Sequence, residues 1–242
     1  MKLMRLALLP LALAALLAIG CGDSGDTIIQ NAPGVSGVSA AGTGRVTGAP
    51  DVVILQLGVD VEMRSVEAAR SAAANSMQAA IDALKANGVE EKDIRTIQFS
   101  VNPQYDVVLN RQTLRGYRVS NMVSAKVRKV DTAGKIIDDV TRAAGDAAIV
   151  RSLSFTIDDP SKLQAQAREL AVKQARERAE QLAKPAGVKI GRVLSITEGG
   201  GTPIVSQAQF AVAAPRTGDT TPIQAGELEI VVNVNAVFAI EE

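Results

Sequence analysis

A long helix is the best-specified element of this sequence, and it restricts the possible folds more than any other stretch. Residues 158–187 read DDPSKLQAQARELAVKQARERAEQLAKPAG. Asp159 and Pro160 are typical of a helix start, because a carboxylate accepts hydrogen bonds from the free amides of the first turn and proline lacks an N–H that would be unpaired there. Pro185 and Gly187 are typical of a helix end.

Small side chains at three- and four-residue spacing predict one narrow buried seam along this helix. The seam consists of Leu163, Ala167, Leu170, Ala171, Gln174, Ala175, Arg178, Ala179, Leu182 and Ala183. Because most of these residues are alanine, we expect the helix to lie close against a sheet or another helix. Charged pairs such as Arg176 and Glu180 suit its solvated side.

Most other segments alternate between apolar and polar residues, which is typical of half-buried strands. The predicted strands cover residues 35–46, 52–62, 94–106, 114–130, 148–157, 189–197 and 227–240, and further helices are predicted at 65–87 and 131–144. Gly42 and Gly44 indicate close backbone approach, and Asn102-Pro103 is expected to bend or end the regular pairing. This order predicts an α+β fold, in which a mainly antiparallel sheet is covered by two long helices and one shorter helix.

The N-terminal residues predict export and lipid attachment. Residues 1–20 have a basic start and an apolar run, as in a secretory signal peptide. The run ends at Ala18-Ile19-Gly20 before Cys21, which resembles a bacterial lipobox, although Ala18 stands where leucine is commoner. Two alternatives are an ordinary signal peptide with an unmodified Cys21 and an uncleaved anchor, for which the run falls short of the ~20 residues that cross a bilayer.

This N-terminus also predicts the domain organisation and the location. After the signal peptide, residues 21–34 would be the acylated cysteine and a flexible tether, and residues 35–242 the α+β domain, with a long loop at 198–225. The protein would be lipid-anchored in the bacterial cell envelope. Gly22 is not the aspartate typical of inner-membrane retention, so the periplasmic side of the outer membrane is expected if the organism has two membranes.

Composition excludes several kinds of catalytic site. The 242 residues include no histidine and one cysteine, so histidine bases, His/Cys metal sites and a disulfide within one chain are excluded. No cofactor and no metal are expected. A hydrolase or transferase could use the carboxylate pairs 138–139 or 158–159, but adjacent helical residues do not face one another and Asp159 caps a helix. We therefore expect no enzymatic activity.

The charge distribution gives no sign of a nucleic-acid partner. The formal net charge of the chain is zero. A basic set on one predicted strand comprises Arg118, Lys126, Arg128 and Lys129. In an exported protein of balanced charge, this set is interpreted as a solvated strand face.

Several segments together resemble the SIMPL domain family of exported bacterial proteins. They are Gly42-x-Gly44, Pro50-Asp51, Gly88-Val89, the run Asp93 to Thr96, Pro103 with Tyr105, Gly116-Tyr117-Arg118, Asn121, the alanine-rich helix ending at Gly187, Thr221-Pro222-Ile223 and Gly226-Glu227. Pro185 and Ala225 depart from the family pattern. The resemblance implies an α+β fold, an envelope location, an association with stress tolerance, no accepted enzymatic activity and, in at least one member, a large ring-like oligomer.

The first functional hypothesis is a non-catalytic, lipid-anchored module for interaction or assembly. Its interface would include Ile204, Phe210 and Val212 of the long loop, buried in a neighbouring subunit; the alternative is a loop folded onto its own domain. The expected partners are the membrane, through the lipid on Cys21, and either another copy or an unidentified envelope protein.

The second hypothesis is a periplasmic protein that binds a small molecule or a peptide. Such a protein needs a pocket with a few convergent polar groups. The candidate ligand-binding residues are Tyr105, Tyr117, Arg118 and Asn121. The structural alternatives are a hydrogen-bonded core asparagine at position 121 and aromatic packing near a hairpin.

Overall fold

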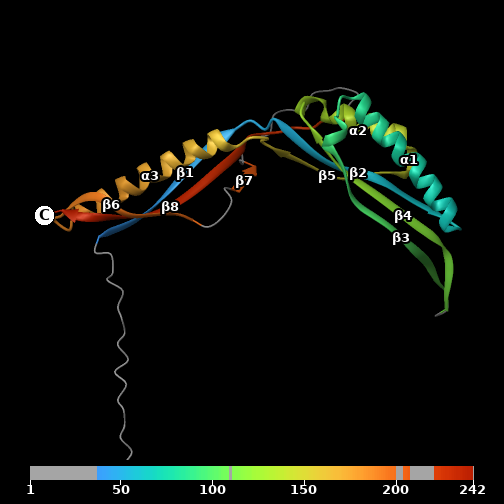
Figure 1. Cartoon of the computed structure of the whole chain (residues 1–242). Coiled ribbons are helices and arrows are strands. Elements are labelled where there is room, and N and C mark those ends of the chain that lie inside the picture. Colours follow the sequence, from blue (N-terminus) through green and yellow to red (C-terminus); the bar gives the residue numbers. More distant parts are fainter. Residues whose placement is uncertain (1–36, 109–110, 200–203, 208–220, 242) are drawn as a thin grey trace, which may run out of the picture. The chain divides into compact units, whose positions relative to one another are not determined.

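The strands form two antiparallel sheets; one helix packs on one face of the first sheet, and two helices pack on one face of the second (Figure 1). The computed structural model describes residues 37–108, 111–199, 204–207 and 221–241. The predicted signal peptide, Cys21 and the predicted tether lie outside these residues, so the domain boundaries stay a prediction. The predicted α+β class is confirmed, and the division into two sheets is added by the structure.

The first sheet is built around the last strand, β8 (Leu228–Glu241). One edge of β8 pairs with β1 (Val38–Gly48). The other edge is shared by β6 (Lys189–Glu198) and the short strand β7 (Ile204–Gln207), which lie opposite different parts of β8. The long helix α3 (Ser161–Ala183) packs on one face, and its alanines join the even-numbered residues of β8 in one apolar core.

The second sheet has the strand order β3-β4-β2-β5. Its strands are β2 (Val52–Met63), β3 (Ile94–Val108), β4 (Arg111–Val127) and β5 (Ala148–Thr156). Helices α1 (Val66–Ala86) and α2 (Ala133–Ala144) cover one face. Short 3-10 turns lie at Glu91–Asp93, Val130–Thr132 and Gly145–Ala147. The core of this sheet shares no residue with the core under α3.

The ends of α1 follow directly from the sequence. The Ser65 hydroxyl accepts a hydrogen bond from the Ala68 N–H at 3.2 Å, as an N-cap does. Asn87 caps the other end, and Gly88 follows with a φ of 83°, a left-handed conformation that glycine adopts without steric cost. The predicted helix start and end are therefore confirmed.

The buried seam of α3 is narrower than the predicted one. Ala167, Ala171, Ala175, Ala179 and Ala183 are buried, so the buried residues recur every four positions. Leu170 and Leu182, which the prediction placed in the seam, are 46% and 57% exposed. The reason is that one column of small residues faces the sheet, whereas the neighbouring column of Leu170, Gln174, Arg178 and Leu182 lies to one side of it.

Two further predictions concern the strands. An irregularity follows Asn102-Pro103, as a register shift between Gln104 and Tyr105, but it does not end the pairing of β3 with β4, which continues to Val108. Proline is tolerated there because β3 is an edge strand, whose outward N–H groups have no ladder partner to lose. The predicted loop at 198–225 contains β7, so this part of it pairs with β8 of the same chain. Ile204 begins β7, whereas Phe210 and Val212 lie outside the described residues; an interface role for these three stays a prediction.

Candidate functional site

The four residues predicted to bind a ligand all lie on the β3–β4 hairpin but do not form one pocket wall. Tyr105 is 53% exposed and lies opposite Leu114. Tyr117 lies opposite Pro103 and packs on the core under α1 and α2. Arg118 forms ion pairs with Asp60 at 3.5 Å and Glu62 at 3.1 Å. The ligand role of these residues stays a prediction, and the cavities described below have other linings.

Asn121 differs from the expected hydrogen-bonded core asparagine. Its side-chain Oδ1 is buried and has no hydrogen-bond partner among the described residues. Asn121 lies opposite Val59 on one side and Phe99 on the other. An unpaired buried oxygen destabilises a fold, so Asn121 costs the folded state free energy at this position.

The carboxylates considered for catalysis are all engaged by neighbouring groups. Asp138 accepts hydrogen bonds from the N–H and the hydroxyl of Thr221 at 3.1 and 2.6 Å. Asp139 accepts hydrogen bonds from Lys135, Asn87 and Arg142. Asp158 pairs with Lys126 and Arg128, and Asp159 accepts from the N–H of Ser161 at 3.1 Å. The contacts of Asp138 and Asp158, and the bond between Asp139 and Asn87, join different parts of the fold. The bonds of Asp139 to Lys135 and Arg142 lie within α2, and that of Asp159 lies at the start of α3. These are structural roles.

These contacts lower the pKa of three of the four carboxyls. Lys135, followed by Asn87 and Arg142, lowers the pKa of Asp139 from 3.8 to about 2. Lys126 and Arg128 lower the pKa of Asp158, and hydrogen bonds from Ser161 lower that of Asp159. These groups are therefore ionised at neutral pH and have no proton to donate as general acids.

A different site is built where α3 runs beside β1. A Cβ atom added to Gly42 would lie 1.9 Å from the carbonyl oxygen of Ala171, and one added to Gly44 would lie 1.7 Å from that of Ala167. The two backbones therefore meet because both positions lack a side chain and the facing helix carries alanine. Gly42 meets Ala171, whereas Gly44 meets Ala167, so the strand and the helix run in opposite directions.

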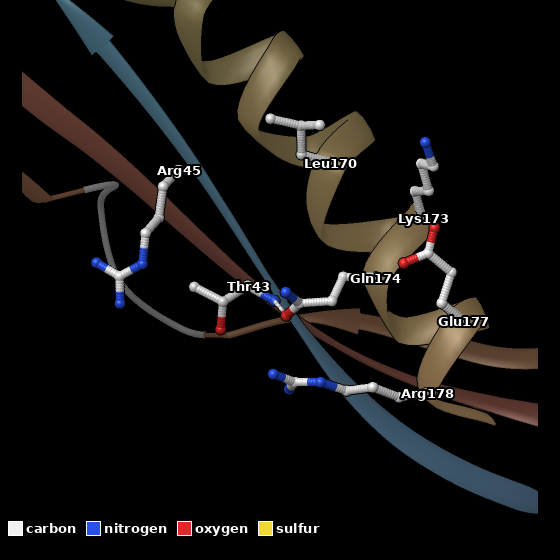
Figure 2. A pocket seen from close by; sticks show the side chains of 7 residues that line it. All are labelled: Thr43, Arg45, Leu170, Lys173, Gln174, Glu177 and Arg178. Carbon is white, nitrogen blue, oxygen red and sulfur yellow. Dashed lines mark hydrogen bonds between the residues drawn. The ribbon is translucent and has the colours of Figure 1, made fainter. Parts of the chain in front are cut away.

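Two side chains of α3 bind the free edge of β1 (Figure 2). Gln174 Oε1 accepts a hydrogen bond from the Thr43 N–H at 2.8 Å, and Arg178 Nη1 donates to the Ala41 carbonyl at 2.9 Å. Both backbone groups point away from β8, since β1 is an edge strand and these residues alternate with those bonded to β8. The side chains thus occupy the positions where the backbone of a further strand would bond.

The match between helix and strand follows from their repeats. Two residues of a strand rise by about 6.7 Å, and four residues of an α-helix rise by about 6 Å. Residues 170, 174, 178 and 182 of α3 therefore follow the outward-facing residues 45, 43, 41 and 39 of β1. The two polar members bond to the middle of the edge. Leu170 lines the groove beside Arg45, and the exposed side chains of Leu170 and Leu182 cannot form hydrogen bonds.

The groove along this edge is open and mainly cationic. It has a volume of about 490 Å³ and is lined by Thr43, Arg45, Leu170, Lys173, Gln174, Glu177 and Arg178 (Figure 2). Arg45 pairs with Glu229 at 3.2 Å across the sheet. Among the described residues, no ion pair involves Lys173 or Arg178. Gln174 and Arg178 were predicted to lie in the buried seam, and only their four-residue spacing relates them to one another in the sequence.

Two other cavities lie elsewhere in the chain. One, of about 220 Å³, borders the bidentate ion pair of Arg128 with Asp93. The other, of about 460 Å³, lies past the end of α3 beside Lys184 and Lys189. Across the part of the chain that the structure describes, no group of three or more metal-ligating side chains is close enough to hold an ion. None of the described helices has the length and apolar character needed to cross a membrane.

Comparison with known proteins identifies a family that covers both sheets. The family described as "SIMPL: Protein of unknown function (DUF541)" matches residues 38–238, from the start of β1 to near the end of β8. A 26 kDa periplasmic immunogenic protein of Brucella melitensis is 33% identical over 214 residues, which are 84% of each chain.

Two more distant relatives carry a name without a function. The uncharacterized protein YggE of Edwardsiella ictaluri is 28% identical over 187 residues, 77% of each chain. YggE of Escherichia coli is 28% identical over 186 residues, 77% of this chain and 74% of the relative.

Proposed function

Because the chain belongs to the SIMPL (DUF541) family, we propose that it is a non-catalytic protein of the bacterial envelope that works by assembling with other copies of itself. The name of the Brucella relative, which is periplasmic, supports the envelope location. Lipid attachment at Cys21 would retain the protein at the membrane, on the periplasmic side of the outer membrane where there are two. A contribution to stress tolerance belongs to this proposal on the family resemblance alone.

The observation that carries the proposal is a group of exposed apolar side chains on the β3–β4 hairpin, the hairpin patch, formed by Tyr105, Val107 and Leu114. Their exposed fractions are 53%, 66% and 50%. Tyr105 lies directly opposite Leu114, and Val107 follows two residues later on the same face of the strand. Contiguous exposed apolar groups of this kind favour protein–protein contact.

The edge of the sheet beside the hairpin patch also suits assembly. β3 is an edge strand that pairs with β4 alone among the described strands. Its outward N–H and C=O groups can bond to a strand of another copy, while the patch is buried in the same contact. Two identical edges related by a two-fold axis meet in this way without any additional chain.

The absence of catalysis is proposed from the state of the polar groups. Asp138 is held by the hydroxyl of Thr221. The other three carboxylates are held by Lys135, Arg128 and Ser161, which lower their pKa values, so they are ionised at neutral pH. A general acid must keep its proton near the working pH. Enzymatic turnover by either aspartate pair would therefore contradict the proposal.

Light scattering over a dilution series of the full-length protein in mild detergent tests the assembly. We expect a stable oligomer for the unmodified chain and a smaller mass for the double variant Tyr105→Ser/Val107→Ser. The matched control is Val193→Ser/Ile196→Ser on β6, where both side chains are also exposed. A monomeric wild type, or an equal loss of mass in both variants, would refute assembly through the hairpin patch.

A further inference from the structure

We infer that the free edge of β1 and the adjoining side of α3 form a binding site for an extended acidic peptide, which adds to the sheet as a further strand. Gln174 and Arg178 hold this edge closed while no peptide is bound. The site lies on different elements from the hairpin patch, so the inference does not rest on the proposed assembly.

The backbone geometry defines what the site accepts. An added strand must accept a hydrogen bond from the Thr43 N–H and donate one to the Ala41 carbonyl, which are the two bonds now made by Gln174 and Arg178. Peptides that extend a sheet gain affinity from such main-chain bonds and specificity from alternate side chains. A groove between an edge strand and a helix provides both.

The closing contacts can be replaced. Each is a single side-chain hydrogen bond; the Arg178 bond is exposed, so water competes for its groups, and the Gln174 bond is partly buried. A peptide strand restores both bonds and adds further ones along the edge. A peptide can begin to pair at Arg45. No hydrogen bond to the outward backbone groups of Arg45 is found among the described residues, and Leu170, which lines the groove beside it, cannot form one.

The side chains around the edge select the charge of the peptide. The groove is lined by three cationic residues, Arg45, Lys173 and Arg178, and by one anionic residue, Glu177. When Arg178 leaves the Ala41 carbonyl, its guanidinium becomes free to bind a carboxylate of the incoming strand. Leu170, which is 46% exposed, offers an apolar contact to a neighbouring peptide side chain. The groove therefore fits a segment that alternates acidic and aliphatic residues.

A second copy of this chain fits the edge less well. Pairing two β1 strands would bring a second Arg45 and a second Arg178 to the same groove, and like charges brought together repel. This outcome is separated from peptide binding in the experiment below.

The test uses the full-length protein in mild detergent and a fluorescein-labelled peptide, Val-Glu-Val-Glu-Val-Glu-Val, titrated to about 1 mM and followed by anisotropy. The comparison peptides are the lysine counterpart and a form N-methylated at alternate amides, which cannot donate to the edge. We expect the acidic peptide to bind and both comparison peptides to lose at least about tenfold in affinity.

Variants of α3 test whether Gln174 and Arg178 give way to a peptide or cover the edge of β1 permanently. Gln174→Ala removes a competing acceptor and should tighten peptide binding by about three- to tenfold. The control Gln164→Ala, four residues before Arg168 on the side of the helix that faces β6, should leave peptide binding unchanged. Lys173→Glu should weaken binding at least about fivefold. Circular dichroism verifies that each variant is folded.

Three results would overturn the inference. The first is failure of the acidic peptide to bind both the wild type and Gln174→Ala. The second is equal binding of the acidic and lysine peptides. The third is an increase in the mass of Gln174→Ala by light scattering without tighter peptide binding, which would mean that Gln174 protects the edge from a second copy.

Discussion

Gly42 and Gly44 show how the absence of two side chains positions an entire helix. Both lie on the face of β1 that meets α3, and an added Cβ would overlap backbone atoms of the helix at either position. Backbone atoms cannot rotate away as the end of a flexible side chain can. The G-x-G spacing therefore sets the distance between helix and strand, which in turn brings Gln174 within reach of Thr43.

This contact predicts the effect of a single methyl group. Gly44→Ala should lower the free energy of unfolding by about 1–3 kcal/mol, as overpacking of a tight core does. Gly199→Ala is the matched control, because its nearest neighbour is an ordinary 3.5 Å contact with the carbonyl oxygen of Asn233. Urea unfolding followed by circular dichroism measures both, and equal stability of the two variants would contradict the close approach.

Asn121 gives a prediction of the opposite sign. Because its Oδ1 is buried without a partner among the described residues, Asn121→Leu should raise the free energy of unfolding by about 1 kcal/mol. The exposed Asn235→Leu serves as control and should change stability little. A destabilised Asn121→Leu would mean that the amide is satisfied in solution, and loss of assembly in a stabilised variant would assign the residue a binding role.

At the scale of elements, polar contacts fix where the helices end and how they pack together. Asn87, which caps α1, donates through Nδ2 to both the Ala83 carbonyl and the Asp139 carboxylate of α2. Lys135 and Arg142 bind the same carboxylate from within α2. Asp139 therefore joins the end of α1 to the middle of α2.

Stability should depend on pH through this carboxylate. Its pKa falls from 3.8 to about 2 in the folded protein, so ionised Asp139 stabilises the fold above about pH 4, and this contribution is lost as the pH falls toward 2. We expect Asp139→Asn to lower the urea midpoint at pH 7, with a difference from wild type that narrows between pH 4 and 2.

The control for this titration is Asp146→Asn, since no ion pair of Asp146 is found in the described part of the chain. Its difference from wild type should stay small across the same range. If the difference in urea midpoint between Asp139→Asn and wild type stays constant down to about pH 2.5, the Asp139 carboxylate is not stabilised by Lys135 and Arg142.

At the scale of the whole molecule, the described residues contain two apolar cores that share no side chain. One lies under α1 and α2, and the other lies under α3. The chain leaves the first sheet for the second after β1 and returns to it after β5. The Asp158 N–H, in the second connection, donates to Asp51 Oδ1, in the first, at 2.8 Å. Separate cores of this kind favour separate units of local unfolding.

Hydrogen exchange of the Gly44→Ala variant tests this separation. We expect faster exchange in β1, β6, β8 and α3, while amides of β2, β4 and α1 keep their protection, because Gly44 contacts one core and not the other. Peptide-resolved mass spectrometry gives the comparison with wild type. Equal acceleration in both sheets would show that the cores unfold as one unit.

The sequence by itself determined the elements and their class. Alternation predicted the strands because successive side chains point to opposite faces of a sheet, and Ser65 and Gly88 marked the ends of α1 because capping is local chemistry. The alanine spacing of α3 and the pair Gly42 and Gly44 also predicted close approach of the backbone, because small side chains allow it wherever they occur. The α+β fold class could therefore be predicted from the sequence.

The tertiary structure decided how these elements pair and which side chains meet. Periodicity states that a strand has two faces but not which strands become neighbours, so the split into two sheets and the strand β7 could not be predicted. The same limit applies to the groove. Gln174 and Arg178 looked like seam residues in the sequence, and they bind the edge of β1 because that edge lies 131 and 137 residues away along the chain and beside them in space.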